Sequence, residues 1–132
     1  MTDTTAFSAL GDQAFVSLTT FRKSGEAVST PVWLARDGDA LIVTTPEESG
    51  KVKRLRNSGR VEMRPCTRMG RVADDAPVVA GSASIIADAP TRDRLTAVIR
   101  KKYGLEFHVI TTIETIVAKR KKERVVLRIT AA

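Results

Sequence analysis

Residues 40–66 read ALIVTTPEESGKVKRLRNSGRVEMRPC, and this stretch decides the fold. The run 40–45 is apolar and β-branched, which predicts a strand. The Pro-Glu-Glu-Ser sequence at 46–49 then predicts a helix start, with its serine as the N-cap. The helix should end near Asn57, and the alternation of apolar and charged residues predicts another strand at 60–66. A short basic helix is therefore expected between two strands.

Upstream of this stretch, β-branched and aromatic residues predict two further strands, at 14–21 and 27–34. A Ser-Gly pair between them and the Asp-Gly-Asp sequence at 37–39 are turn signals. Pro31 cannot donate a ladder hydrogen bond, so it marks an edge strand or a bulge. Three strands joined by tight turns predict an antiparallel meander.

Downstream, the sequence predicts a strand at 78–86, a helix from Thr91 as its N-cap to about Gly104, and a last strand at 123–130. The segment 107–118 is ambiguous between a helix and an irregular stretch. The sum is six strands with two or three short helices. Antiparallel β order with few long helices favours a small, mainly β barrel over a doubly wound sheet.

The composition is that of one ordinary soluble domain, expected to span 1–132. The N-terminus is acidic, and no stretch approaches the roughly 20 apolar residues that a membrane helix needs, so neither secretion nor membrane spanning is expected and no membrane partner is assigned. The single cysteine, Cys66, excludes an intrachain disulfide and suits a cytoplasmic location.

The charge balance is strongly basic. The 22 Lys and Arg against 15 Asp and Glu give a net charge of +7, which favours anionic partners. Eight of the bases lie between Gly50 and Val72, where Glu62 is the only acid, and a second cluster spans 119–124. Nucleic acid, anionic lipid and a phosphorylated small molecule all fit this charge.

The basic helix is the best candidate for an anion site. Lys51 and Arg54 stand three apart, so they project from neighbouring positions on one side of the helix. The helix follows a strand, so its N-terminal amides and positive dipole end are placed to meet an anion. The alternative is a solvated helix face. Because the spacing of a Walker A loop or a GxGxxG turn is missing, nucleoside triphosphates and Rossmann-type binding are disfavoured.

The remaining distinctive residues give weaker signals. Cys66 is expected to be a small hydrophobe, since no histidine lies near it in sequence. The single histidine, His108, has no identifiable triad or metal-binding partner, so no metal site and no catalytic residue is assigned. Trp33 fits the core, a dimer interface or the wall of a ligand pocket. Six aromatic residues are few for the stacking platforms of a single-strand binder, which disfavours nucleic acid.

Several short motifs stand in a fixed order between about Phe15 and Ile86. They are Thr30-Pro31-Val32-Trp33, Asp37-Gly38, the segment 49–56, Arg60-Val61, Arg64-Pro65-Cys66 and Gly70-Arg71. In this order and spacing the chain resembles the pyridoxamine-phosphate-oxidase-like split barrels. Within them it is most similar to the actinobacterial branch of deazaflavin (cofactor F420)-dependent oxidoreductases.

This resemblance implies a fold, an assembly and a set of site residues. The fold is a six-stranded antiparallel split β-barrel of the FMN-binding type, and the assembly is a homodimer with a cofactor at each of two sites between subunits. Lys51 matches the family's phosphate-binding lysine, with Lys53 and Arg54 as helpers. The other residues that it places around the cofactor are Thr44, Thr45, Thr30, Pro31, Val32, Pro65 and Cys66.

The resemblance also implies the chemistry. F420 is the expected cofactor and FMN the alternative, and the reaction is hydride transfer to a small, conjugated, electron-poor molecule. No strong general acid is identified, so the proton is expected from solvent or from a hydroxyl of the substrate. Other members of this fold bind FMN, haem or a bilin, which leaves a second interpretation: a barrel that holds a cofactor or tetrapyrrole without turnover.

Overall fold

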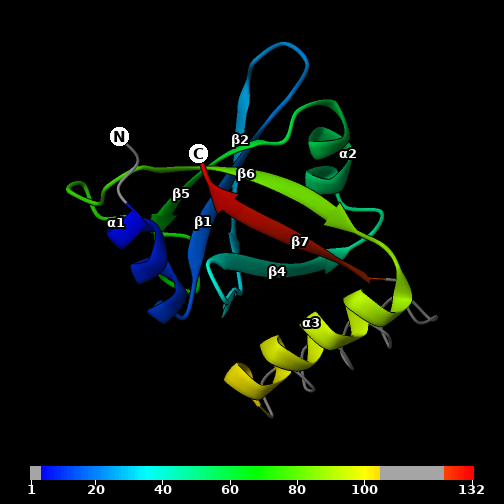
Figure 1. Cartoon of the computed structure of the whole chain (residues 1–132). Helices are drawn as coiled ribbons and strands as arrows, with labels where there is room; N and C mark the ends of the chain where they lie inside the picture. The colour runs from blue at the N-terminus through cyan, green and yellow to red at the C-terminus, as the bar shows by residue number, and fades with distance from the viewer. Residues whose placement is uncertain (1–3, 105–123) are drawn as a thin grey trace.

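The computed structural model describes residues 4–104 and 124–132, which form one curled antiparallel sheet with helices around it (Figure 1). The helices are α1 Thr4–Ala9, the 3-10 helix η1 Leu10–Asp12, α2 Gly50–Asn57 and α3 Ala89–Tyr103. The strands are β1 Val16–Phe21, β2 Ala27–Val32, β3 Ala35–Asp37, β4 Ala40–Pro46, β5 Arg60–Pro65, β6 Val79–Ile86 and β7 Arg124–Ala131. Their order in the sheet is β2-β1-β5-β6-β7-β4-β3.

The last strand, β7, lies between β6 and β4 and so joins the two parts of the sheet (Figure 1). Its register places Val126 opposite Thr44 of β4. On the other side, β6 needs a glycine at position 81. A Cβ on Gly81 would lie 2.9 Å from Ile129 Cγ2 and 3.1 Å from the carbonyl oxygen of Thr130, closer than packing allows. Close contact with β7 therefore depends on Gly81.

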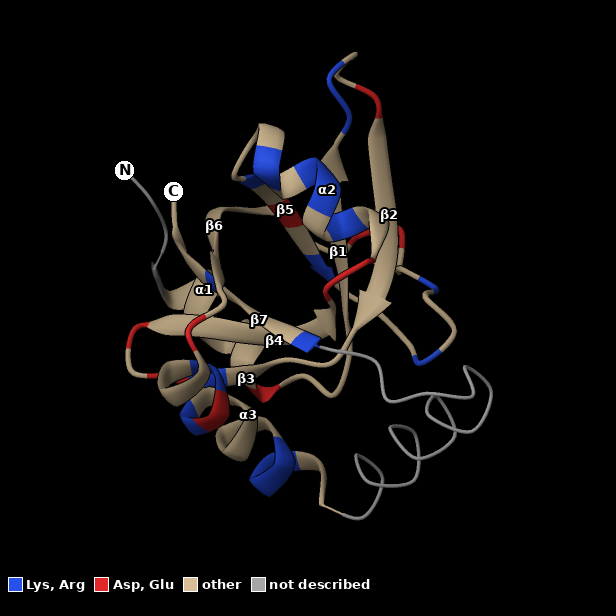
Figure 2. Cartoon of the chain, turned by 90° about the vertical axis from the view of Figure 1, so that its right-hand side faces the viewer, with Lys and Arg blue, Asp and Glu red and all other residues tan. Residues whose placement is uncertain are grey.

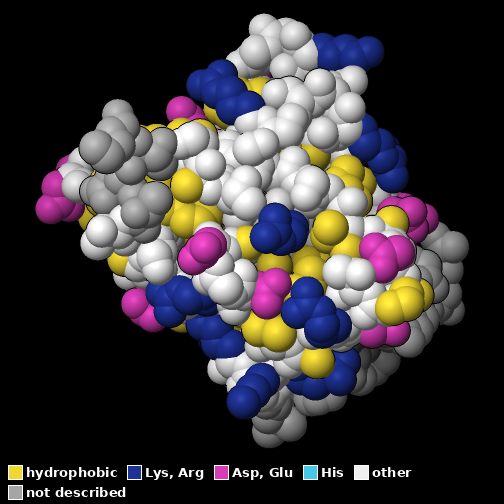
Figure 3. Space-filling model, in the orientation of Figure 1, with side chains coloured by type: hydrophobic (Ala, Val, Ile, Leu, Met, Phe, Trp, Pro, Cys, Tyr) yellow, Lys and Arg dark blue, Asp and Glu magenta, His cyan; other side chains and the backbone are white. Residues whose placement is uncertain are grey.

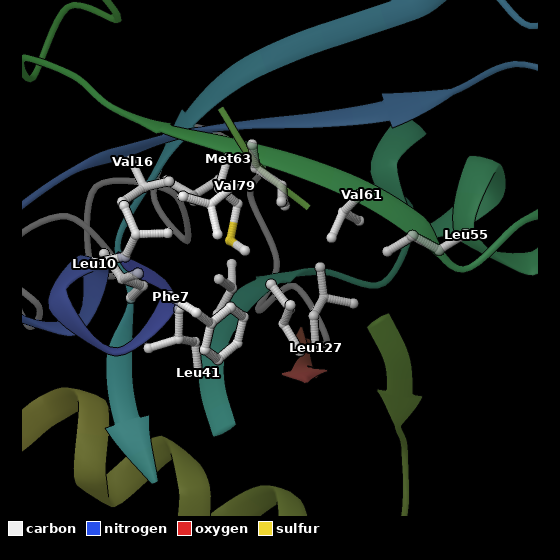
Figure 4. Close-up of a cluster of buried hydrophobic side chains, with 14 residues drawn as sticks. Phe7, Leu10, Val16, Leu41, Leu55, Val61, Met63, Val79 and Leu127 are labelled. Carbon is white, nitrogen blue, oxygen red and sulfur yellow. The ribbon is translucent and has the colours of Figure 1, made fainter. Parts of the chain in front are cut away.

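Two hydrophobic clusters hold the sheet and the helices together. Side chains of α1, η1, α2 and six strands converge in the larger one, of which Figure 4 shows the packing. The smaller cluster lies between α3 and the sheet, and its buried members are Ala35, Ile42, Leu95, Ile99 and Val126. Leu95 and Ile99 stand four apart, so they share one face of α3. Each such buried side chain contributes about 1.5–3 kcal/mol.

The expected count of six strands is corrected to seven within the described residues. The second predicted strand, 27–34, ends at Val32, and β3 begins as a separate strand. The reason lies at Leu34, whose backbone N–H donates to the Tyr103 hydroxyl at 3.0 Å and whose carbonyl accepts from Lys102 Nζ at 2.8 Å. Because these two side chains of α3 satisfy the N–H and C=O of Leu34, those backbone groups are not available to a strand ladder.

Three other expectations differ from the structure or fall outside it. The helix α1 was not predicted from the sequence. The N-cap of α3 is Asp88, whose carboxylate accepts the N–H of Thr91 at 3.1 Å, whereas the sequence had indicated Thr91 itself. The segment 107–118, His108 and Glu123 lie outside the described residues.

The last turn of α3 is tied to distant backbone by Lys102. Its Nζ donates three hydrogen bonds, to the carbonyl oxygens of Gly11, Gln13 and Leu34 at 2.9, 2.7 and 2.8 Å. Next to it, Tyr103 stacks on the half-buried Trp33 with ring centroids 4.8 Å apart. One helix end thus fixes η1 and the chain between β2 and β3.

We expect the substitution Lys102→Met to lower the free energy of unfolding by about 1.5–3 kcal/mol, because hydrogen bonds of a charged group are lost. Chemical denaturation measures this difference. The matched control is Lys101→Met, which removes the same charge from an exposed neighbour and should change stability by less than about 0.5 kcal/mol. Equal effects of the two substitutions would contradict the role of Lys102.

Candidate functional site

The first part of the predicted site lies where β4 ends and α2 begins. Thr44 and Thr45 are buried, and the Thr45 hydroxyl donates to Ser49 Oγ at 3.1 Å. Ser49 is the N-cap of α2 and accepts the N–H of Val52 at 3.5 Å, which confirms the cap that the sequence predicted. Val52 and Leu55 are buried and seat the helix on the sheet. Local capping and spacing therefore place the basic side chains of α2 beside the end of β4.

Figure 2 shows that α2 is rich in basic residues. Two of them, Lys51 and Arg54, act on the same region as Arg124 of β7. Arg54 Nε donates to Thr20 Oγ1 of β1 at 2.6 Å. Arg124 donates from Nε to Thr44 Oγ1 at 3.1 Å and from Nη2 to the Thr44 carbonyl at 3.3 Å. Lys51 stands near both arginines, since the charge of each acts on it. We call Lys51, Arg54 and Arg124 the cation cluster.

The cation cluster carries an electrostatic cost. Lys51 is half-buried, and burial, then Arg54, then Arg124 lower the pKa of its ammonium group below the ordinary 10.5. Within residues 4–104 and 124–132, no carboxylate forms an ion pair with Lys51 or Arg54. Two like charges, Lys51 and Arg54, to which the described residues bring no carboxylate, are typical of a site that receives an anion.

Lys53 is not brought to the cation cluster. It stands two residues after Lys51 and therefore about 200° around the helix axis. Its side chain is exposed. Of the three basic residues that the resemblance assigned to the phosphate, the structure brings together Lys51 and Arg54.

The second part of the predicted site lies across β1. Its residues are Thr30, Pro31 and Val32 on β2, Pro65 at the end of β5, and Cys66 after it. Val32 and Pro65 both pair with Val16, from opposite sides of β1. The antiparallel register thus assembles two segments that the sequence separates.

Thr30 has a buried hydroxyl without a hydrogen-bond partner in the part of the chain that the structure describes. Thr30 pairs with Leu18, a fully buried core residue, so its side chain projects toward the same face of the sheet as the core. An unsatisfied buried hydroxyl costs about 1–3 kcal/mol, and native structures seldom leave one without a reason. Thr30 therefore suits a hydrogen bond to a ligand or to water.

The two parts of the site are separated along β1. Arg54 reaches Thr20 near one end of the strand, whereas Val32 and Pro65 pair with Val16 at the other. Four residues of strand span about 13 Å. Thr30 of the second part lies between these ends, because it pairs with Leu18, two residues from Thr20.

A cavity of about 480 Å³ adjoins the second part of the site. Its lining residues are Pro65, Cys66, Thr67, Arg71, Val72, Ala73 and Asp74. Burial raises the pKa of the Cys66 thiol, which favours the neutral form. A neutral thiol is a poor nucleophile, so this agrees with the expectation that Cys66 is a small hydrophobe. A larger cavity of about 820 Å³ lies among α1, β3 and β7 and touches none of the predicted site residues.

Sequence reasoning missed two residues of the site, Arg124 and Thr20. The sequence pattern placed Arg124 only in the basic cluster 119–124, and Thr20 only in the predicted strand 14–21. Their partners, Thr44 and Arg54, lie 80 and 34 positions away. No local pattern signals a contact of that range.

Other kinds of site find little support in residues 4–104 and 124–132. No group of three His, Cys, Asp or Glu side chains comes together there in a way that could hold a metal ion. None of the helices described is long and apolar enough to cross a membrane. On the face shown in Figure 3, acidic side chains are interspersed with the basic ones, so the charge there is not one continuous basic field.

Residues 3–132 match the family model described as pyridoxamine 5'-phosphate oxidase. No curated protein matches the chain. The matched residues include both parts of the predicted site, so the match is not confined to one motif.

Several solved structures share the fold. One, an F420 reductase, has a TM-score of 0.61 at 19% identity, over 94% of this chain and 91% of its own. The heme storage protein HutZ from Vibrio cholerae has a TM-score of 0.67 at 11% identity, over 100% of this chain and 92% of its own. An FAD-binding protein from Mesorhizobium loti has a TM-score of 0.58 at 15% identity, over 96% of this chain and 85% of its own. At these identities the likeness shows the fold alone.

We expect Lys51→Gln to raise the free energy of unfolding of the ligand-free protein at pH 7, because a half-buried charge beside two other cations is removed. The folded-state pKa of Lys51 lies below the unfolded 10.5, so between these values the folded state binds fewer protons than the unfolded state. Wild-type stability at this site therefore rises with pH, and the advantage of the variant should shrink toward pH 10.5.

Urea denaturation at neutral and at high pH measures this difference. Lys53→Gln is the control, because it removes the same charge from an exposed position on the same helix. A loss of stability in Lys51→Gln at pH 7, or an equal gain in Lys53→Gln, would contradict the electrostatic account.

Proposed function

Because the chain belongs to the pyridoxamine 5'-phosphate oxidase family, we propose that it is an oxidoreductase that binds an anionic flavin-type cofactor at the start of α2. The cofactor proposed first is F420, with FMN as the alternative. The reaction proposed is hydride transfer to a small, conjugated, electron-poor molecule, in the cytoplasm. The actinobacterial deazaflavin-dependent branch of the family is the proposed affiliation.

The cation cluster is the observation that carries this proposal. Lys51, half-buried and with a lowered pKa, stands in the first turn of α2, where the helix dipole also favours negative charge, and Arg54 of the last turn is fixed on Thr20. The phosphate of a flavin or deazaflavin would neutralise this charge. The Thr30 hydroxyl, for which the described residues offer no hydrogen-bond partner, fits the same cofactors, since the rings of both carry polar edges.

The choice between cofactors rests on the sequence motifs and on the neighbouring structures. The ordered motifs from Thr30 to Arg71 favour F420, and an F420 reductase shares the fold. An FAD-binding protein and a heme storage protein share it as well, which keeps FMN and a non-catalytic tetrapyrrole carrier as competing functions.

Each part of the site has a role in this proposal. Lys51 and Arg54 would bind the phosphate, and Thr44 and Thr45 would line the chain that joins phosphate and ring. Thr30 would meet the ring edge. When bound in its reduced form, F420 or FMN would supply the hydride and become oxidised. The balancing proton would come from solvent or from a hydroxyl of the substrate, beside the cavity at Pro65 and Cys66.

The proposed assembly is a homodimer with a cofactor between subunits. The first part reaches β1 at Thr20, and the second part extends along β1 from Leu18, opposite Thr30, to Val16, about 13 Å from Thr20. A cofactor held by both parts would take the first from one subunit and the second from its partner.

We expect FMN or F420 to bind with micromolar or tighter affinity, and Lys51→Gln to weaken this binding about 10- to 100-fold, because charge-assisted hydrogen bonds are lost. Fluorescence titration with each cofactor measures both. Lys53→Gln should bind like the wild type. Binding of neither cofactor by the wild type would refute the proposal.

Turnover separates an enzyme from a carrier. Reduced F420 should be oxidised above background when quinones or enones are added to the protein. Tight binding without any oxidation would instead support cofactor or tetrapyrrole storage.

Sedimentation velocity should show a dimer of the 132-residue chain at micromolar concentration. A monomer that nevertheless binds the cofactor with both parts of its site intact would contradict a site shared between subunits. Thr30→Val, which removes the hydroxyl at nearly constant shape, should weaken cofactor binding without dissociating the dimer.

A further inference from the structure

Arg124 lies in a fixed position beside the start of α2. It is the first residue of β7 and pairs with Pro46, the last residue of β4. Its guanidinium donates to the Thr44 hydroxyl at 3.1 Å and to the Thr44 carbonyl at 3.3 Å. A planar guanidinium held by two such bonds keeps one orientation. Arg124 thus stands against the residues that lead into α2.

The charge of Arg124 acts on the same space as the charge of Lys51. The two residues come from distant segments, yet Arg124 is near enough to lower the pKa of Lys51. Arg54, which donates to Thr20 of β1, adds a third positive charge and also lowers the pKa of Lys51. Cations from both α2 and β7 can contact a bound anion from more directions than the two residues of α2 alone.

We propose that Arg124 is a third ligand of the anionic group of the cofactor, together with Lys51 and Arg54. The inference rests on the proposed function and deepens it, because it assigns the phosphate to α2 and β7 together. Arginine suits this position, since its five donors allow it to hold Thr44 and to contact an anion at once. A consequence is selectivity for phosphorylated over unphosphorylated ligands.

The probe for this inference is inorganic phosphate alone, so the test does not depend on which cofactor binds. We expect phosphate to raise the unfolding temperature of the wild-type protein, because it binds the folded state. Arg124→Ala should weaken phosphate binding at least 10-fold and remove most of this shift. Arg128→Ala is the matched control: it removes an exposed arginine from the same strand and should respond like the wild type.

Two further variants separate contact with the anion from support of Thr44. Arg124→Lys keeps the charge and gives up the planar fork, so it should recover part of the phosphate affinity. Thr44→Val removes the hydroxyl acceptor and leaves the guanidinium charge, so it should retain more affinity than Arg124→Ala. If Arg124→Lys behaves like Arg124→Ala, and Thr44→Val does too, Arg124 acts only by supporting Thr44 and the inference is overturned.

The outcomes distinguish this inference from the proposed function. If phosphate shifts the wild type and Arg124→Ala equally, or shifts neither, the third ligand is refuted whatever FMN and F420 do. If phosphate protection depends on Arg124 while no cofactor binds, the anion site stands and the oxidoreductase proposal falls. Should Arg124→Ala fail to fold, as judged by circular dichroism, the thermal shift that phosphate causes is compared between Arg124→Lys and Arg128→Lys. A smaller shift in Arg124→Lys supports the inference, and equal shifts refute it.

Discussion

The pairing of β7 with both β4 and β6 is the constraint on which the rest of the structure depends. One part of the sheet is the run β2-β1-β5-β6, the other is β4-β3, and β7 is the strand that hydrogen-bonds to both. This pairing encloses the larger core and fixes Gly81 against Ile129. It also places Arg124 beside Thr44. The strand that completes the fold therefore completes the cation cluster.

The cation cluster shows how a small fold can hold an unfavourable arrangement. Lys51 and Arg54 lie on the same helix as Val52 and Leu55, whose burial seats that helix on the sheet. Apolar burial of about 1.5–3 kcal/mol per side chain offsets the repulsion between the cations. Charge that destabilises the ligand-free protein is then available to bind an anion, as is common at functional sites.

Local signals predicted the elements around the site, and long-range contacts explain what they missed. The cap at Ser49 and the apolar spacing of α2 lie within eight residues, so the sequence alone reveals them. The break at Leu34 depends on Lys102 and Tyr103, 68 and 69 positions away, and no local pattern contains it. The inclusion of Arg124 in the site has the same origin, because strand order decides which distant residues meet.

The two parts of the site differ in what completes them. The part at α2 brings like charges together, whereas the part across β1 has the Thr30 hydroxyl, which is buried and has no hydrogen-bond partner among the residues described, and an adjoining cavity at Pro65. The part at α2 suits an anion, and the part across β1 suits a group that offers both a hydrogen bond and apolar surface. A molecule with a phosphate at one end and a polar-edged aromatic ring at the other supplies both. In the proposed homodimer, such a molecule would lie between two copies of the chain.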